Sequence, residues 1–174
     1  MSHEPDFDGL VTAYYASLYQ FAFSLARDEA SACDLTQQTF CIWAAKGHQL
    51  RDKSKVKTWL FTTLHREFLA IRRRQNKFPQ IEIGFAAEEL PTVAPASVNR
   101  LDTAQLLAAL AQLDDIYQTP VALFYLQDHS YNEIAEILEV PLGTVKSRLT
   151  RGLDKLHLLL ADKPSGPHSN QKNL

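Results

Sequence analysis

Five side chains between positions 146 and 151 have the chemistry of a DNA-reading surface. The set combines cations with hydroxyls: Lys146, Ser147, Arg148, Thr150 and Arg151. An arginine fork matches the edge of guanine, while Ser and Thr hydroxyls suit phosphates or mixed base contacts. These residue types therefore favour recognition of duplex DNA over the making or breaking of bonds.

The surrounding sequence predicts a helix-turn-helix that would position this surface. Ser130 and Glu133 form an S-x-x-E capping box, which starts a helix. The turn Glu139–Pro141 follows, although Glu139 stands where a turn favours Gly. The second helix has an apolar stripe that leaves the cations and hydroxyls outward: Val145, Leu149, Leu153 and Leu156. Such a helix presents its N-terminal half to a major groove; the alternative is a helical hairpin with a solvated basic face.

Two further residues bear on the packing of this motif. The first helix is expected to bury Ile134, Ala135 and Leu138, and Ala135 is small where another helix would cross closely. Gly152 lies inside the second helix, where it costs roughly 1 kcal/mol relative to Ala.

The segment 53–77 is a second candidate for nucleic-acid chemistry. Residues 51–77 carry nine cations and two carboxylates, and aromatic side chains are interleaved with them: Trp59, Phe61, His65 and Phe68. Cations can follow a phosphate backbone, and aromatic rings can stack on unpaired bases. The alternative is that Trp59 and Phe68 belong to a core and that Arg72–Arg74 is a solvated helix end, favoured there by the helix dipole.

The overall charge conceals an alternating pattern. The chain has 174 residues and a formal charge of −2, with a pI near 6.3. By segment, however, residues 1–50 carry −4, 51–77 carry +7, 78–145 carry −9 and 146–174 carry +4. The mean charge disfavours a surface that holds phosphates everywhere, but it does not exclude DNA binding at two basic blocks.

Hydrophobic periodicity predicts an all-α protein with two small helical bundles joined by a flexible linker. An apolar stripe runs from Leu10 to Leu25, and Asp28 can cap a second helix that ends near Lys46 with Gly47 in the left-handed conformation. A third helix follows Ser54, and Phe78-Pro79 stops it. Its apolar face consists of Val56, Leu60, Thr63, Leu64, Phe68 and Ile71. No stretch alternates with a period of two for long enough to predict a sheet.

The domain boundaries follow from changes in composition. Residues 79–100 contain Pro and Gly without a helical stripe and are expected to form a linker between an N-terminal domain, 1–78, and a C-terminal domain, 101–161. In the second domain, helical periodicity resumes at Leu101, and a helix covers about 116–127 with Pro120 in its first turns. Residues 162–174 are expected to be a disordered tail.

No other constellation predicts catalysis or a bound cofactor. Cys33 and Cys41 have no zinc-ligand spacing, the histidines show no H-x-x-x-H pattern, and neither a phosphate-binding G-x-x-x-x-G-K-[ST] loop nor a G-x-S-x-G elbow is present. The sequence predicts no enzyme, no metal and no small-molecule substrate. Because no apolar run is long enough to cross a bilayer and the acidic start is unlike a signal peptide, a cytoplasmic protein without membrane partners is expected.

Four motifs in order resemble those of the extracytoplasmic-function (ECF) sigma factors, the small two-domain bacterial transcription initiation subunits. The segment 34–40, DLTQQTF, is similar to the family's D-L-x-Q-E-x-F signature, and 58–61, TWLF, is similar to its T-W-L-F segment. Segments 130–136 and 141–149 are similar to the two parts of its promoter-reading helix-turn-helix. The resemblance covers about residues 8–160.

The resemblance implies three sets of functional residues. Binding to core RNA polymerase would involve Asp34, Leu35, Gln37, Gln38 and Phe40. Recognition and melting of the downstream promoter element (minus-ten) would involve Lys55, Lys57, Trp59, Arg66, Arg72, Arg73 and Arg74. Recognition of the upstream element (minus-thirty-five) would involve Thr144, Lys146, Ser147, Arg148, Thr150 and Arg151. The family often has an anti-sigma partner as well.

The sequence departs from the family pattern at a few positions. Gln38 stands where the family usually has Glu, and Arg66 and Ala70 stand where Asn and Asp are common. A second hypothesis is a stand-alone helix-turn-helix regulator with a helical sensor domain. The polar segment 34–40 distinguishes the two, because a stand-alone regulator has no need of a polymerase-docking face.

Overall fold

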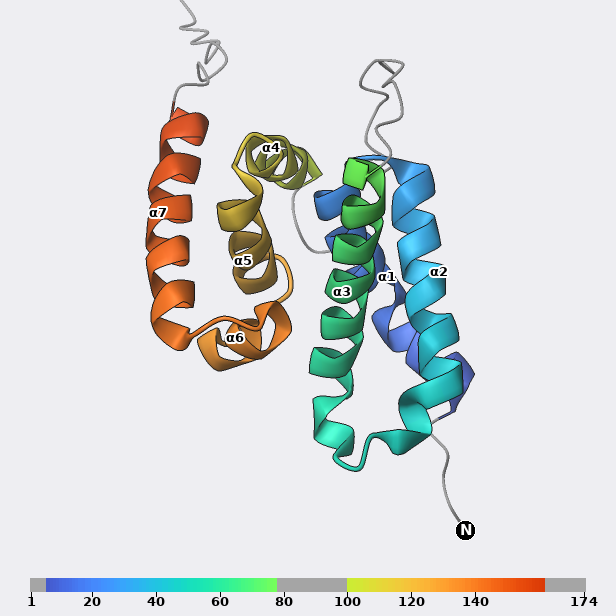
Figure 1. The fold of residues 1–174 in the computed structure, drawn as a ribbon. Helices are drawn as coiled ribbons and strands as arrows, with labels where there is room; N and C mark the ends of the chain where they lie inside the picture. Colours follow the sequence, from blue (N-terminus) through green and yellow to red (C-terminus); the bar gives the residue numbers. More distant parts are fainter. Residues whose placement is uncertain (1–5, 78–99, 162–174) are drawn as a thin grey trace, which may run out of the picture.

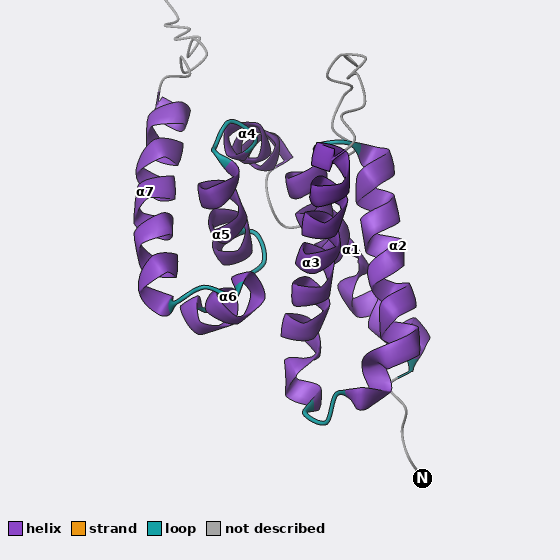
Figure 2. Ribbon diagram, viewed as in Figure 1, coloured by secondary structure: helices purple, strands orange, loops and turns teal. Residues whose placement is uncertain are grey.

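The computed structural model describes residues 6–77 and 100–161, and all regular structure within these ranges is helical (Figures 1 and 2). The first bundle consists of α1 (Phe7–Ala26), α2 (Glu29–Lys46) and α3 (Val56–Lys77), with 3-10 turns at Gly47–Gln49 and Lys53–Lys55. The second consists of α4 (Arg100–Leu110), α5 (Asp115–Tyr125), α6 (Tyr131–Leu138) and α7 (Leu142–Ala161). The predicted fold class, two helical bundles with a helix-turn-helix in the second, is confirmed.

The first bundle packs α1, α2 and α3 around a core of aliphatic and aromatic side chains. Phe21 of α1 and Phe61 of α3 are fully buried with ring centroids 5.3 Å apart. Leucines from all three helices surround this pair: Leu18, Leu35, Leu60 and Leu64. The predicted apolar face of α3 is confirmed in its N-terminal part, but Ile71, near the C-terminal end of the helix, is 37% exposed.

The ends of α1 and α2 confirm one of the two predicted helix-capping residues and contradict the other. Asp28 caps α2 as predicted, with its Oδ1 accepting a hydrogen bond from the Ser31 amide at 2.8 Å. The prediction for Gly47 is wrong, since this residue is right-handed, with φ −60° and ψ −27°. A Cβ at Gly47 would lie 2.5 Å from Cδ2 of the Trp43 ring, so this glycine permits a close approach rather than a left-handed turn. Arg27, after α1, takes the left-handed conformation instead, with φ 64°.

The second bundle contains the predicted helix-turn-helix. The Ser130 Oγ accepts a hydrogen bond from the Glu133 amide at 3.2 Å, while a Glu133 carboxylate oxygen accepts one from the Ser130 amide at 2.8 Å. The bond from the Ser130 amide to the Glu133 carboxylate is the main reason that the pKa of Glu133 is lowered, because it stabilises the charged form. Glu139 ends α6 in the left-handed conformation, with φ 55°, at the position where Gly was expected to be favoured.

The buried faces of α6 and α7 differ in part from those predicted. Ile134 and Ile137 are buried on α6, whereas Ala135 and Leu138 are only half-buried. On α7, Leu153 is half-buried and Gly152 takes its place in the core. A Cβ at Gly152 would lie 2.7 Å from a Val121 methyl of α5. The glycine therefore allows α5 and α7 to pack closely, which explains a residue that is unfavourable for the helix itself.

The two bundles lie against each other. Helix α3 contacts α6, and α1 contacts α5, while α7 packs on the α4, α5 and α6 side (Figure 1). The expected linker at 79–100 lies outside the described residues except for Arg100, which the structure places at the start of α4. The expected helix stop at Phe78-Pro79 and the expected tail at 162–174 also lie outside the described residues. None of the described helices is both long and apolar enough to span a membrane.

Candidate nucleic-acid and polymerase interfaces

The N-terminal half of α7 presents the side chains predicted to read DNA. Lys146, Ser147, Thr150 and Arg151 are exposed, while Thr144 and Arg148 are half-buried. Ser147 Oγ donates to the Thr144 carbonyl at 3.1 Å and Thr150 Oγ1 donates to the Lys146 carbonyl at 2.9 Å, so both hydroxyl oxygens keep acceptor capacity toward solvent. Within the described residues, no ion pair occupies the three cations of this set. The helix is therefore accessible to a phosphate backbone.

Unlike the cations of the α7 surface, three cations of the predicted downstream-element surface form ion pairs. Lys55 Nζ pairs with Glu136 at 3.1 Å, Arg66 pairs with Glu139, and Arg72 pairs with Asp115. The hydrogen bond from Arg66 is the main reason that the pKa of Glu139 is lowered. Each of these carboxylates belongs to the second bundle. Arg73 and Arg74, at the exposed end of α3, have no ion pair among the described residues.

Lys57 also reaches the second bundle. Its Nζ donates to the backbone carbonyl of Gln127 at 2.6 Å, in the loop that leads into α6. Beside it, His129 is buried, its ring lying edge-on to Phe61 with centroids 4.7 Å apart. Burial, assisted by the Lys57 cation, lowers the pKa of His129 from 6.5 to about 4. His65 on α3 has a lowered pKa as well, chiefly through burial.

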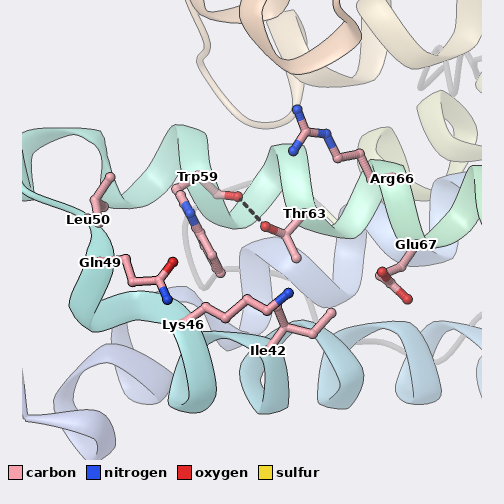
Figure 3. A pocket seen from close by; sticks show the side chains of 8 residues that line it. All are labelled: Ile42, Lys46, Gln49, Leu50, Trp59, Thr63, Arg66 and Glu67. Atoms are coloured by element: carbon pink, nitrogen blue, oxygen red, sulfur yellow. Dashed lines mark hydrogen bonds between the residues drawn. The ribbon is translucent and has the colours of Figure 1, made fainter.

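A cavity of about 510 Å³ lies beside Trp59, between α2 and α3 (Figure 3). Its walls combine apolar side chains with cations and amides: Ile42, Lys46, Gln49, Leu50, Trp59, Thr63, Arg66 and Glu67. In Figure 3 the Trp59 ring projects into this space, whereas the guanidinium of Arg66 points toward the second bundle. The mixture of a flat aromatic ring, hydrogen-bonding groups and a lysine suits a planar polar ligand near a phosphate.

The Trp59 ring is positioned from the core side. Trp43 of α2 is buried and meets Trp59 edge-on, with ring centroids 5.0 Å apart and planes at 77°. Trp43 in turn lies directly against Gly47. Gly47, Trp43 and Trp59 therefore form a continuous line of contacts from the end of α2 to the cavity.

The polymerase-binding set predicted on α2 separates into two groups. Asp34, Gln37 and Gln38 are exposed, and their spacing places them on one helix face. Leu35 and Phe40 are only 2% and 6% exposed, so in this fold they hold the helix in the bundle rather than offer contact surface. Phe40 is stacked on Tyr15 of α1, with ring centroids 6.3 Å apart.

Several residues that line the cavity were not predicted from the sequence. Lys46 and Gln49 line the cavity from the α2 side, and Thr63 and Glu67 line it from α3. The signal was present in part, because positions 59, 63 and 67 follow helical spacing from the tryptophan. The facing wall depends on how α2 packs against α3, which spacing alone does not reveal. Within the described residues, no group of three or more His, Cys, Asp or Glu side chains gathers to hold a metal ion.

Comparison with known families matches both bundles to regions of one family. Residues 10–78 match Sigma-70 region 2, and residues 103–156 match Sigma-70, region 4. The ECF RNA polymerase sigma factor SigM of Bacillus subtilis is 27% identical over 153 residues, covering 87% of this chain and 93% of that protein. The RNA polymerase sigma factor YlaC of the same organism is 30% identical over 156 residues, covering 87% and 90%. The ECF RNA polymerase sigma factor EcfG of Rhodopseudomonas palustris is also 30% identical, covering 86% and 82%.

Solved structures agree with these matches. The sigma factor RpoE of Bartonella quintana, in complex with the anti-sigma factor NepR, superposes with a TM-score of 0.75 at 30% identity, covering 91% of this chain and 99% of that one. The structure of CnrH in complex with the cytosolic domain of CnrY gives a TM-score of 0.65 at 25% identity, covering 90% and 89%.

Proposed function

The chain belongs to the ECF family of RNA polymerase sigma factors, and we propose that its two bundles divide the recognition of one promoter between them. As a sigma factor it binds core RNA polymerase and directs promoter-specific initiation of transcription. The observation that carries the proposed division is the presence of two separate DNA-type surfaces, on α3 and on α7, in a chain that also exposes a polar face on α2. Nucleotide addition belongs to the polymerase, and the chain itself acts in the cytoplasm without catalytic activity.

Helix α7 reads the upstream promoter element in this proposal. Its exposed half carries the residues that can contact base edges and phosphates: Thr144, Lys146, Ser147, Arg148, Thr150 and Arg151. Arg151 is exposed and has no ion pair among the described residues, so a bidentate contact to guanine is open to it. Helix α6 packs against α7 and buries Ile134 and Ile137 in the core of the second bundle.

Helix α3 binds the downstream element and holds its opened strand. We assign the cavity beside Trp59 to one unpaired base, stacked on the indole, with Lys46 close enough to face the adjoining phosphate. Stacking of a base on an aromatic side chain contributes about 1–3 kcal/mol, which offsets part of the energy of unpairing. The cations that flank the cavity along the helix would follow the strand: Lys55, Lys57, Arg66, Arg72, Arg73 and Arg74.

The exposed face of α2 docks on the core polymerase. Asp34, Gln37 and Gln38 offer hydrogen-bonding groups to solvent, and Leu35 and Phe40 anchor the helix beneath them. One solved relative, RpoE of Bartonella quintana, is a sigma factor bound to an anti-sigma factor, which supports an anti-sigma partner for this chain too. Such a partner would compete with the polymerase for these surfaces.

Run-off transcription with purified core polymerase and a set of genomic promoter fragments tests the proposal. Asp34→Arg should abolish co-purification with core, whereas Asp154→Arg, a matched charge reversal on the exposed side of the second bundle, should not. Stimulation of run-off by the wild-type chain supports the sigma assignment. Tight footprints by the isolated chain without any transcription in the presence of core would instead favour the stand-alone regulator.

A further inference from the structure

The cavity beside Trp59 has one wall on which hydrogen-bond acceptors follow a flat aromatic ring. All of its lining residues lie between positions 42 and 67, so the cavity belongs to the first bundle alone. Trp59, Thr63 and Glu67 form the α3 wall at intervals of four residues, which places them on one face of the helix (Figure 3). Arg66 also lines the cavity, but its guanidinium points away, toward Glu139 of the second bundle.

The Thr63 hydroxyl offers only its lone pairs to the cavity. Its Oγ1 donates to the Trp59 carbonyl one turn earlier at 2.9 Å, which is the dashed line in Figure 3. Because the single hydroxyl proton is engaged within the helix, the oxygen is left as an acceptor. At this position the α3 wall therefore accepts hydrogen bonds and does not donate them.

The Glu67 carboxylate continues the same wall one turn further. The side chain is half-buried at the cavity and forms no ion pair among the described residues. An ionised carboxylate only accepts hydrogen bonds, and its two oxygens can accept two parallel bonds from one planar group. This end of the cavity therefore favours a ligand that presents adjacent donors.

The α2 side of the cavity discriminates less between bases. Gln49 carries both a donor and an acceptor, and Lys46 is the cation that the proposed function assigns to the adjoining phosphate. Ile42 and Leu50 contribute apolar surface. The choice between bases therefore depends on the α3 wall, where the indole is followed by two acceptors.

The four unpaired bases differ in the donors that they offer to such a wall. The Watson–Crick edge of guanine carries adjacent donors, N1–H and the N2 amino group, which match both oxygens of a carboxylate. Adenine and cytosine each offer one amino group beside a ring nitrogen that accepts. Thymine offers N3–H between two carbonyl oxygens, which a carboxylate repels. An acceptor-only wall therefore favours guanine and disfavours thymine.

We propose, as a deepening of the proposed function of α3 on which it rests, that the cavity selects an unpaired guanine. Glu67 accepts hydrogen bonds from N1–H and the N2 amino group while the base stacks on Trp59. In duplex DNA this edge is engaged by cytosine, so the selection acts only on the opened strand. Glu67 is thus a specificity-determining residue that reads sequence after melting.

The test uses holoenzyme reconstituted from the full chain and purified core polymerase. Its templates are promoter fragments with a preformed bubble over the downstream element, so that the energy of unpairing does not vary with the base. Each unpaired position is changed in turn to each of the four bases, and affinity is measured by competition in a gel shift. Two variants are compared with the wild type after circular dichroism has verified their folding.

The two variants remove the same charge from the same bundle. Glu67→Gln preserves the size of the side chain and replaces one acceptor with a donor. Glu29→Gln is the matched control, since Glu29 is exposed in the first turn of α2 and does not line the cavity.

At one bubble position the wild-type holoenzyme should bind guanine roughly tenfold or more tightly than thymine, because hydrogen bonds to a charged group are strong. Glu67→Gln should reduce this preference to about threefold or less at that position only, since one acceptor remains. Glu29→Gln should retain the full preference. Trp59→Ala should weaken binding of all four bases at the same position, which locates the base held in the cavity.

The outcomes separate this assignment from the proposed function. A holoenzyme that stimulates run-off transcription but prefers guanine at no bubble position would overturn the assignment while the proposed function stands. A preference that survives in folded Glu67→Gln would overturn it as well. Absence of run-off with the wild-type chain would instead contradict the proposed function, and the base assignment with it.

Discussion

Alanine at Gly152 and alanine at Gly143 add the same methyl group to the same helix, and we expect opposite effects on stability. Both glycines lie in α7, where alanine is the better helix former by about 1 kcal/mol in the interior. Gly143 is in the first turn, and no atom lies within 4 Å of an added Cβ. Gly143→Ala should therefore raise the free energy of unfolding by about 0.5–1 kcal/mol.

At Gly152 the added methyl has no room. The Cβ would lie 2.7 Å from Val121 Cγ2, 3.3 Å from Tyr117 Cβ and 3.4 Å from the Tyr117 carbonyl oxygen. Valine is stiff at χ1 and the Tyr117 backbone belongs to α5, so relief requires that α5 and α7 move apart. Overpacking of this kind costs about 1–3 kcal/mol, which outweighs the gain in helix propensity. Gly152→Ala should lower the free energy of unfolding by about 1–2 kcal/mol.

Urea unfolding followed by far-ultraviolet circular dichroism measures both effects. The two variants should shift the midpoint in opposite directions with little change in the slope m, since the surface exposed on unfolding is nearly the same. If Gly152→Ala raises the midpoint as Gly143→Ala does, the close packing of α7 on Tyr117 and Val121 does not exist in solution. The comparison is internal, so errors in extrapolation to water affect both variants equally.

The remaining predictions concern the two promoter surfaces and the contact between the bundles. Gly47→Ala should displace the Trp43 ring, since a Cβ would lie 2.5 Å from it, and should reduce open-complex formation through Trp59 more than it reduces co-purification with core; permanganate footprinting measures the opening. Arg151→Ala should weaken binding of the polymerase-bound chain to a mapped promoter by roughly 1–3 kcal/mol if its guanidinium contacts a base, and unchanged affinity in a gel-shift titration would remove it from the reading surface. Because the pKa of His129 is lowered to about 4 from 6.5, unfolded chains bind more protons between these values, and stability should fall as pH drops through this window, by about 2 kcal/mol at pH 5. Urea titrations at pH 7 and pH 5 measure this loss, which should be absent in His129→Gln.

Local signals were sufficient for most of the helices. The cap at Asp28 and the capping box at Ser130 depend on residues within three positions, and both are confirmed in the structure. The left-handed Glu139 was also indicated, because the turn geometry is local. The contacts that end a helix join residues close in sequence, so they can be predicted from the neighbouring residues.

The roles of the glycines could not be predicted in the same way. Gly47 looked like a helix terminator, yet its function is to leave space for the Trp43 ring one turn earlier. Gly152 looked like a local cost, and its reason lies on another helix, at Val121. In both cases the deciding quantity is a distance to a bulky side chain, which depends on packing and not on propensity.

The functional surfaces show the same difference between features set by local sequence and features set by packing between helices. Exposure of the reading residues on α7 follows from helical periodicity, because the Val145 and Leu149 stripe determines which side faces solvent. Burial of Leu35 and Phe40 was not foreseen, since the motif that contains them was carried over as a unit from a family resemblance. The cavity beside Trp59 required two helices to be placed relative to each other before its second wall existed.

The charge pattern depends on both the sequence and the fold. Residues 51–77 carry +7 and residues 78–145 carry −9, and the ion pairs of Lys55, Arg66 and Arg72 join these two blocks across separations of 81, 73 and 43 residues. Segment charges of opposite sign indicate that the blocks can attract each other, but only the fold decides which carboxylate meets which cation. Once they are paired, the block of +7 no longer measures the phosphate affinity of the free chain, whereas Lys146, Arg148 and Arg151 on α7 have no ion pair among the described residues. The charge that matters for promoter binding is therefore that of each surface in the folded chain, not that of each sequence segment.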